Sequence, residues 1–268
     1  MSRPTFVDTH VHLTDHRYDS DRTETLERAA EAGVTMLVNI ATTLENAQAG
    51  LELVQQTTGL RLPRLFTTAG FHPHDAAAYD AATHDDGLRA LFARPEVVAV
   101  GETGLDYHYD FSPRPAQMTA FRAHIQLALE ADLPLVIHCR ESFADLVAVI
   151  SEYRGDPRLR GVFHCFSEGA AEAQRVLELG FMLGFGGVAT YPKSDSVRAA
   201  LREAGPTHVV LETDGPYLAP VPRRGKRNES SYVPYVAEVV AREWGCDIEE
   251  VGLATTRNAH RLYRLPEA

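Results

Sequence analysis

The residues of this sequence that could do chemistry stand where short apolar runs end. An apolar core excludes ionisable groups, so their repeated placement at such points indicates a common function rather than packing. Imidazole and carboxylate groups together suit divalent metals such as zinc and manganese. The candidate metal ligands, each at or near the end of an apolar run, are His10, His12, Glu102, His138, His164 and Asp214.

Two histidines close the first apolar run. Alternation along a strand places His10 and His12 on one face, with Asp8 on the same face one step deeper. We expect the two imidazoles to bind a metal and the Asp8 carboxylate to fix the tautomer of a ligating histidine from behind. A histidine pair at this spacing is weak evidence alone, because ordinary strand histidines share it, but the other candidates of the set favour the metal.

His138 and His164 each follow an apolar run, PLVI in the first case and GVF in the second. A single histidine in such a place is more often a hydrogen-bonded core residue than a ligand. Because both stand at the same point of their runs, we interpret the two together as metal ligands.

The candidate carboxylates are Glu102 and Asp214. Glycines flank Glu102 in VGETGLDY and allow the backbone to approach closely, and a carboxylate there can bridge two cations. We assign Asp214, in VVLETDGPYL, to a metal and to the attacking water. Glu212 lies two residues earlier on the same face and would support the ligands from behind, or serve only as a buried ion-pair partner.

Short strand-like runs alternate with amphipathic helical stretches from end to end. Eight such runs predict an α/β fold, the (β/α)₈ or TIM barrel, with the metal site at the rim where the C-terminal ends of the strands converge. An open, doubly wound sheet is the alternative, but it typically has a glycine-rich loop after its first strand, where HVHLTD stands here. The tail after residue 228 should form closing helices. The predicted strands are 5–12, 34–41, 64–72, 97–104, 134–139, 161–166, 181–187 and 207–214, and the clearest predicted helices are 21–33 and 115–133.

The chain has 268 residues, for which we expect a single domain, 1–268. Its net charge of −11 argues against a protein that coats nucleic acid, but not against an enzyme that binds a few phosphates. No apolar stretch approaches the roughly 18 residues of a membrane span, and the N-terminus leaves no room for a signal peptide. Three cysteines at irregular spacing imply no disulfide framework. These features predict a cytoplasmic protein with no membrane association and no obligatory protein partner.

The motifs around these residues, taken together, resemble the TatD family of metal-dependent hydrolases, known as TatD-type DNases and related to the amidohydrolases. Six motifs occur in order across essentially the whole chain: DTHVHL, GFHPH, GETGLDY, VIHCRES, GVFHCFS and LETDGPYLAPVPRRGKRNE. The resemblance implies metals bound by the six candidate ligands, and hydrolysis of phosphodiesters, typically of DNA from the 3′ end. One departure is Gly215, where the family often has serine in ETDSP. The missing hydroxyl is expected to change contacts that support the metal ligands or that touch the substrate, but it removes no metal ligand.

In this interpretation two divalent cations, of Mg²⁺, Mn²⁺ or Zn²⁺, clamp a phosphate and activate a water. Asp214 accepts the proton of that water, so Asp214 and Glu102 are the expected catalytic residues. One cation is expected on His10, His12 and Asp214, and the other on His138 and His164, with Glu102 shared.

DNA or another phosphodiester is the expected substrate, and its phosphates need positively charged or N–H partners. Arg140 directly follows His138 and suits bidentate contact, and Arg224 and Lys226 stand in the basic loop 223–227. A solvated charged turn is the alternative for that loop. His72 in GFHPH is expected to reach the phosphate or the leaving group.

Two other classes of function are open at this point. The same metals could hydrolyse an amide, an ester or a lactone, including the acyl bond of an aminoacyl-tRNA, because fold and metal site do not fix the substrate. Arg140 and the basic loop favour a phosphodiester. The chain could instead be a non-catalytic metal or nucleic-acid binding module, which the full set of six ligand-type residues argues against.

Overall fold

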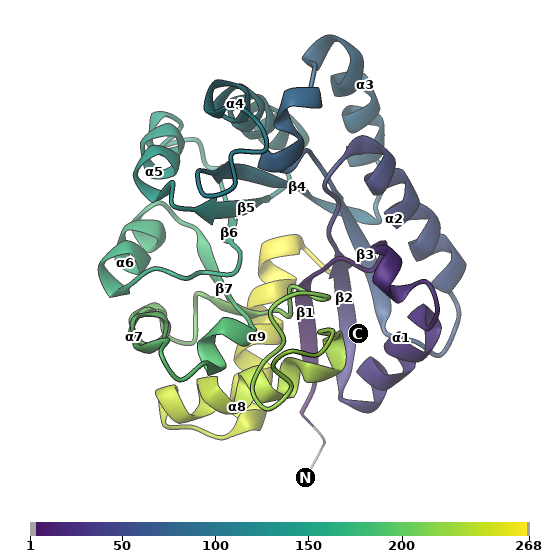
Figure 1. Cartoon of the computed structure of the whole chain (residues 1–268), viewed down its shortest axis with the longest axis vertical. Helices are drawn as coiled ribbons and strands as arrows, with labels where there is room; N and C mark the ends of the chain where they lie inside the picture. The colour runs from purple at the N-terminus through teal and green to yellow at the C-terminus, as the bar shows by residue number, and fades with distance from the viewer. Residues whose placement is uncertain (1–3, 267–268) are drawn as a thin grey trace.

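Each of the eight predicted runs forms a strand, and the strands lie side by side in chain order around a ring (Figure 1). The computed structural model describes residues 4–266. Every neighbouring pair of strands is parallel. The strands are β1 (Phe6–Val11), β2 (Val34–Asn39), β3 (Arg64–Ala69), β4 (Val97–Asp106), β5 (Leu135–Arg140), β6 (Gly161–Phe163), β7 (Met182–Phe185) and β8 (Val209–Leu211).

The end of the last strand meets the first strand, which makes the sheet a barrel. Val11 and Gly215 form a parallel bridge between the two edges of the sheet. The amide of His12 donates to the carbonyl of Gly215 at 2.7 Å, and the amide of Asp214 donates to the carbonyl of His10 at 2.8 Å. The predicted (β/α)₈ barrel is therefore confirmed, and the open doubly wound alternative is wrong.

Helices surround the ring of strands (Figure 1). The predicted helices 21–33 and 115–133 correspond to α1 (Arg22–Glu31) and α4 (Arg114–Ala131), and the tail forms α8 (Val233–Trp244) and α9 (Ile248–Tyr263). The remaining helices are α2 (Leu44–Thr57), α3 (Ala81–Phe92), α5 (Phe143–Glu152), α6 (Ala170–Glu178) and α7 (Asp195–Ala204), with the short 3₁₀ helices η1 (His16–Tyr18), η2 (Pro73–Ala78), η3 (Gly187–Thr190) and η4 (Ser230–Tyr232).

The buried apolar side chains form two main layers, as the alternation along a strand predicts. One layer lies between the strands and the surrounding helices and includes Phe6, Leu37 and Phe163. The other fills the barrel interior with at least one residue from every strand, and residues at the C-terminal end of α9 pack against it. This helix end closes the N-terminal end of the barrel. Because the strands are all parallel, their polar C-terminal ends gather at the opposite rim. The α9 and following residues in the inner layer are Ala259, Leu262, Tyr263 and Leu265.

Three strands end three residues earlier than predicted, and three others end one or two residues early. The runs 64–72, 161–166 and 207–214 are strands only as far as residues 69, 163 and 211. Beyond β6 and β8 the backbone turns, because Cys165 has a φ of 45° and Asp214 a φ of 57°, left-handed values that a strand does not accommodate. The candidate ligands His164 and Asp214 therefore lie in turns just past the strand ends.

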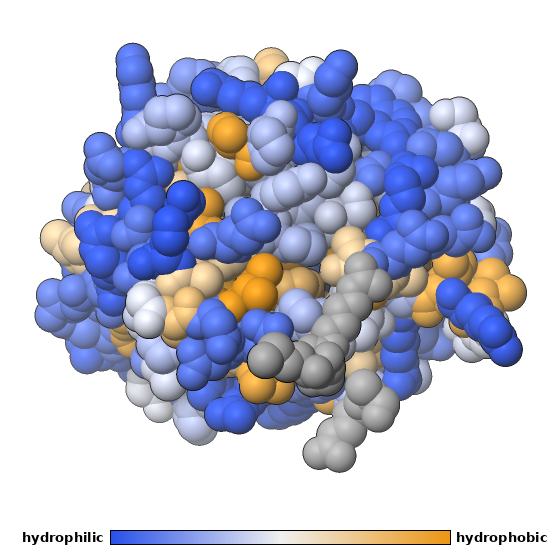
Figure 2. Space-filling model, turned by 90° about the horizontal axis from the view of Figure 1, so that it is seen from below, coloured by the Kyte–Doolittle hydropathy of each residue, from blue (hydrophilic) through white to orange (hydrophobic). Residues whose placement is uncertain are grey.

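The face of the molecule shown in Figure 2 is mostly hydrophilic, with apolar side chains confined to smaller areas between charged and polar ones. Within residues 4–266, no helix combines the length and the apolar character needed to cross a membrane. The three cysteines are all among the described residues, and each is a free thiol.

Candidate metal and catalytic site

A buried glutamate occupies the centre of the C-terminal rim. Glu102 lies in β4 and is only 2% exposed. The glycines around it let neighbouring strands approach closely: Gly104 has a φ of 141°, and a Cβ there would collide with the carbonyl oxygen of His138 in β5. The motif VGETGLDY therefore brings β4 against β5, and the Glu102 carboxylate faces imidazoles from several strands.

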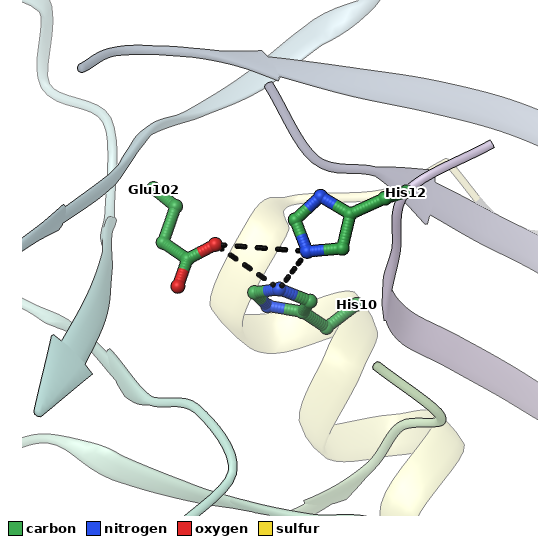
Figure 3. A group of neighbouring side chains, drawn as sticks. All are labelled: His10, His12 and Glu102. Atoms are coloured by element: carbon green, nitrogen blue, oxygen red, sulfur yellow. Dashed lines mark hydrogen bonds and ion pairs between the residues drawn. The ribbon is translucent and has the colours of Figure 1, made fainter. Parts of the chain in front are cut away.

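The Oε2 atom of Glu102 faces the histidines at the end of β1 (Figure 3). Its distance is 3.4 Å to Nε2 of His10 and 3.8 Å to Nε2 of His12, and these two nitrogens lie 3.3 Å from each other. Oδ1 of Asp214 lies 3.4 Å from Nε2 of His12 and 3.7 Å from Nε2 of His10. The two histidines thus point the same way, and four ligand-type residues converge there.

The Oε1 atom of Glu102 faces a second group of imidazoles. Nε2 of His164 lies 2.7 Å from this oxygen and Nδ1 of His138 lies 3.0 Å from it. Nε2 of His72 is 3.4 Å from the same oxygen and 3.3 Å from Nδ1 of His138. Each oxygen of one carboxylate therefore meets a different cluster of nitrogen atoms, which is the arrangement that a bridging ligand requires.

All of these groups except His10 line one cavity, with a volume of 530 Å³. Four carboxylates line it, and no lysine or arginine among residues 4–266 does so. Three aromatic side chains, Tyr109, Phe111 and Tyr217, also belong to its wall. The cavity is therefore acidic and partly aromatic, and any phosphate entering it depends on bound cations. The four carboxylates belong to Asp15, Asp75, Glu102 and Asp214.

The imidazoles keep the buried carboxylates ionised. Burial alone raises the pKa of Glu102, but the facing imidazoles of His164 and His72 outweigh it and hold that pKa well below its ordinary value. Burial likewise raises the pKa of Asp214, but the hydrogen bond with His12 and the nearby imidazoles of His10 and His164 together outweigh it, so that the pKa is lowered. In return Glu102 raises the pKa of His164 well above its ordinary value, against the effect of burial.

This set of donor atoms fits a divalent metal. A neutral imidazole has one N–H and one lone pair, and the Nε2 atoms of His10 and His12 both face the ionised Glu102. Lone pairs that converge in this way repel one another unless a proton or a cation lies between them. Imidazole nitrogen mixed with carboxylate oxygen is the donor set of many zinc and manganese sites. In the triples His10–His12–Glu102 and His72–Glu102–His138, all donor atoms lie within 4.8 Å of one another.

Asp106 holds His138 in place, a role that the sequence did not predict. Its Oδ2 accepts from Nε2 of His138 and from Nε2 of His74, both at 2.9 Å. Because Nε2 of His138 donates, its Nδ1 keeps a lone pair that faces Glu102. Strand β4 runs two residues further than predicted and ends at Asp106, four residues after Glu102. That spacing repeats a face along a strand, and it is the signal that would have identified Asp106.

His72 presents an N–H group to the cavity. Its Nδ1 accepts the amide of His74 at 3.1 Å, so the neutral ring carries its proton on Nε2, the atom that faces Glu102. Burial lowers the pKa of His72 to about 4, and the ring is therefore neutral at pH 7. His72 is suited to donate a hydrogen bond to a substrate oxygen, although its Nε2 also lies close enough to the second group to be a ligand.

Asp8 is placed differently from expectation. Its carboxylate accepts from the hydroxyl of Thr213 at 2.6 Å, from the amide of Thr213 at 3.0 Å and from the amide of His10 at 3.3 Å. Burial raises its pKa to about 6. Instead of orienting an imidazole, Asp8 ties the end of β1 to the segment after β8, and the Nδ1 atom of His10 has no hydrogen-bond partner among the described residues.

Glu212 lies behind His164, where a supporting residue was expected. Its Oε1 is 3.6 Å from Nδ1 of His164 and accepts the amide of Cys165 at 2.6 Å. Glycine at position 184 leaves room for this carboxylate, because a Cβ at Gly184 would collide with Oε2 of Glu212. The His164 ring is held from its other face by the His10 ring, which stacks on it at 3.9 Å between centroids.

The three cationic residues predicted to bind phosphate lie outside the cavity lining. Arg140 is exposed, and its guanidinium lies over the ring of Tyr109, 4.7 Å from the centroid. Arg224 lies over Tyr191 at 4.5 Å, and Lys226 is exposed. A role for them in substrate binding stays a prediction, and it would concern parts of the substrate that extend out of the cavity.

Sequence and structure both match one family of proteins. The sequence profile of the TatD related DNase family matches residues 7–264. An uncharacterized metal-dependent hydrolase of Bacillus subtilis (strain 168) is 37% identical over 96% of this chain and 98% of its own length. A protein of Citrobacter rodentium (strain ICC168), described as a 3′-5′ ssDNA/RNA exonuclease TatD, is 34% identical over 94% of this chain and 95% of its own length.

Solved structures agree with this match. The crystal structure of a TatD homologue from Escherichia coli K12 has a TM-score of 0.88 to this chain at 28% identity, and covers 97% of this chain and 98% of its own. An organophosphorus hydrolase from Deinococcus radiodurans, at 16% identity and a TM-score of 0.63, shares the fold alone. The family match spans all six ligand-type residues. The chain therefore belongs to the TatD related DNase family, and it is a metal-dependent hydrolase.

Proposed function

We propose that this hydrolase cleaves phosphodiester bonds of single-stranded nucleic acid from the 3′ end, with two divalent cations at the C-terminal rim of the barrel. The observation that carries the proposal is the division of the Glu102 carboxylate between two groups of ligand-type residues. The relatives described as 3′-5′ ssDNA/RNA exonucleases match almost the whole chain and support the substrate class and the direction.

Each group has the residues to hold one cation. The first would be held by His10, His12 and Asp214 and the second by His138 and His164, with Glu102 shared between them. Cations so held stabilise the charge that develops on a phosphate and make water more acidic.

Asp214 is the residue for proton transfer. It lines the cavity with a side chain that is 13% exposed, and its lowered pKa keeps it ionised, which is the form that accepts a proton. Water adds to phosphorus, its proton passes to the Asp214 carboxylate, and the P–O bond to the leaving part of the strand breaks. The leaving oxygen takes up a proton, which protonated Asp214 or solvent supplies, and departs as a hydroxyl group. His72 donates its Nε2–H to a substrate oxygen in the same cavity.

The test of this function couples metal content to nuclease activity. Protein stripped with a chelator and reloaded with Mg²⁺, Mn²⁺ or Zn²⁺ is given single-stranded DNA labelled at either end. We expect activity to require two bound cations per chain, a 3′ label to be released at once, and a 5′ label to remain on progressively shorter fragments. Intact DNA together with turnover of simple esters or amides would favour an acyl hydrolase instead.

A single substitution tests the role of Asp214. Asp214→Asn should lower kcat by about 10²–10⁴-fold, the usual contribution of a general base, while the thermal unfolding temperature changes little. Asp86→Asn is the matched control, because it makes the same change on α3, where the carboxylate is fully exposed. A kcat for Asp214→Asn close to that of the control would refute the proton-transfer role.

A further inference from the structure

Two exposed aromatic side chains stand at the mouth of the cavity. Phe111 is 67% exposed and Tyr109 is 47% exposed, and both belong to the cavity wall. Their rings stack on each other, with centroids 5.3 Å apart and planes within 6° of parallel. Because the guanidinium of Arg140 lies over Tyr109, the series of stacked groups runs from Arg140 through Tyr109 and ends at Phe111.

The loop that carries these rings is fixed by buried polar contacts. Oδ1 of Asp106 accepts the amides of His108 and Tyr109 at 2.9 and 3.0 Å. Nε2 of the buried Gln117 donates to the carbonyls of Asp106 and Ser112, both at 2.9 Å. These hydrogen bonds fix the loop in a conformation that leaves both rings exposed to solvent, although burial of their apolar surface would be more favourable. An exposed apolar surface that is held in this way indicates a ligand.

The charges around the cavity restrict the chemistry of that ligand. The lining has four carboxylates and, within residues 4–266, no lysine or arginine. Asp15 is paired with Arg17 beside the lining, and the other three carboxylates repel a phosphate backbone. A nucleic-acid substrate must gain its affinity from the cations and from contacts that do not depend on charge. Nucleobases supply such a contact, because every base has a π face that stacks on aromatic rings.

We infer that Phe111, backed by Tyr109, is the stacking surface for an unpaired base at the 3′ end of the substrate. The inference rests on the proposed function and adds an element that favours single strands, because a terminal base in a duplex is held by its pairing partner and is stacked on the neighbouring pair. Phe111 also meets the imidazole of His74 edge to face at 4.8 Å, but it stays 67% exposed. Tyr217 lies in the same wall but is only 45% exposed, and the guanidinium of Arg17 already lies over its ring, 4.2 Å from the centroid.

The test combines a change in the protein with a change in the substrate. Single-stranded oligonucleotides with either normal or abasic 3′-terminal nucleotides are given to the metal-loaded wild type and to three variants, Phe111→Ala, Phe111→Trp and Leu253→Ala. Leu253 lies on α9 outside the cavity lining and is 66% exposed, so its variant controls for the loss of an exposed apolar side chain. Kd is also measured by fluorescence anisotropy with metal-loaded protein and oligonucleotides whose 3′-terminal linkage resists hydrolysis, which gives a readout independent of catalysis.

In the wild type, abasic ends should raise KM by about 5- to 150-fold, the range of one base–aromatic stack. Phe111→Ala should raise KM for the normal end by a similar factor and remove the difference between the two substrates, with little change in kcat. Phe111→Trp and Leu253→Ala should both keep the wild-type difference, and Kd should follow the same order.

Two outcomes separate this inference from the function on which it rests. Equal KM and Kd for normal and abasic ends in the wild type, or an undiminished difference in Phe111→Ala, would overturn the stacking surface while leaving the nuclease intact. If the metal-loaded wild type cleaves neither oligonucleotide, the proposed function is wrong and the inference falls with it.

Discussion

Gly215 packs against Tyr18, so a side chain at position 215 should destabilise the protein. A Cβ on Gly215 would lie 2.6 Å from the hydroxyl oxygen of Tyr18. Tyr18 has little room to move, because it is fully buried, donates to the carbonyl of Asn228 at 2.7 Å and has the guanidinium of Arg227 over its ring. A serine here, as the family often has, would therefore meet Tyr18, and Gly215 does not line the cavity.

The size of the effect follows from two opposing contributions. Adding a methyl group to a filled space costs about 1–3 kcal/mol. The backbone of Gly215 is not left-handed, so alanine introduces no strain there and gains about 0.4–1 kcal/mol by restricting the unfolded chain. We expect Gly215→Ala to lower the free energy of unfolding by about 1–2 kcal/mol.

Removing the hydroxyl of Tyr18 should relieve the collision. Tyr18→Phe alone should cost about 1 kcal/mol, the value of one hydrogen bond. The next atom that a Cβ on Gly215 would meet is Oγ1 of Thr213 at 3.3 Å, a contact that a small adjustment accommodates. In the Tyr18→Phe background, Gly215→Ala should therefore be neutral or slightly stabilising.

Urea unfolding of the wild type, the two single variants and the double variant measures this coupling directly. The four proteins are stripped of metal first, because a bound cation would stabilise each of them to a degree set by its own affinity. The reasoning is refuted if Gly215→Ala costs the same in both backgrounds, or if it costs nothing in the wild type.

Three further changes test the site and its support. His164→Ala should lower the bound metal per chain in elemental analysis, and an unchanged content would remove His164 from the ligand set. Asp106→Asn should weaken metal affinity by about 10- to 100-fold in a chelator competition, because the His138 ring loses its charged acceptor; an unchanged affinity would show that the acceptor is dispensable. Burial lowers the pKa of His124 to about 4. Below pH 6.5 the unfolded chain therefore takes up a proton on this ring more readily than the folded chain does. The free energy of unfolding should fall by about 3 kcal/mol as the pH drops from 6.5 towards 4. His124→Gln should remove that part of the acid destabilisation in urea unfolding, and equal pH slopes for variant and wild type would contradict it.

The strand positions could be predicted from the sequence because of the way a parallel barrel buries its strands. Both faces of each strand are covered, so the strands appear as continuous apolar runs such as VVAV and PLVI. Their ends were less predictable. Strand β8 stops at Leu211 because the backbone of Asp214 turns into a left-handed conformation as it meets β1, and that contact joins residues far apart in the chain.

The candidate site could be predicted as a set of residues but not as a geometry. Parallel topology brings His10, Glu102 and His138 to one rim whatever the details of packing. The geometry depends on the register of β4 against β5, where Gly104 pairs with His138. This register decides which imidazoles each oxygen of Glu102 faces, and it brings Asp106 within hydrogen-bond distance of His138. No local pattern in the sequence determines that register.

The misplacement of Asp8 has a comparable cause. Strict alternation along β1 would put Asp8 and His10 on one face, but the register of β1 against β2 shifts between Asp8 and Val11. The shift breaks the period of two at the point where the ligand-type histidines begin. The Asp8 carboxylate then turns to Thr213 instead of to the His10 ring.

The acidic lining of the cavity links metal binding to the choice of substrate. Two divalent cations would bring four positive charges to four carboxylates, of which Asp15 is already paired with Arg17, so the negative charge of the lining would be fully offset. A chain with a net charge of −11 can then accept a phosphate locally while its overall field still opposes long-range attraction of nucleic acid. Because charge alone discriminates weakly in such a cavity, the proposed preference for a nucleic-acid end over a small ester would come from uncharged contacts. In this structure the exposed stack that ends at Phe111 is placed to provide them.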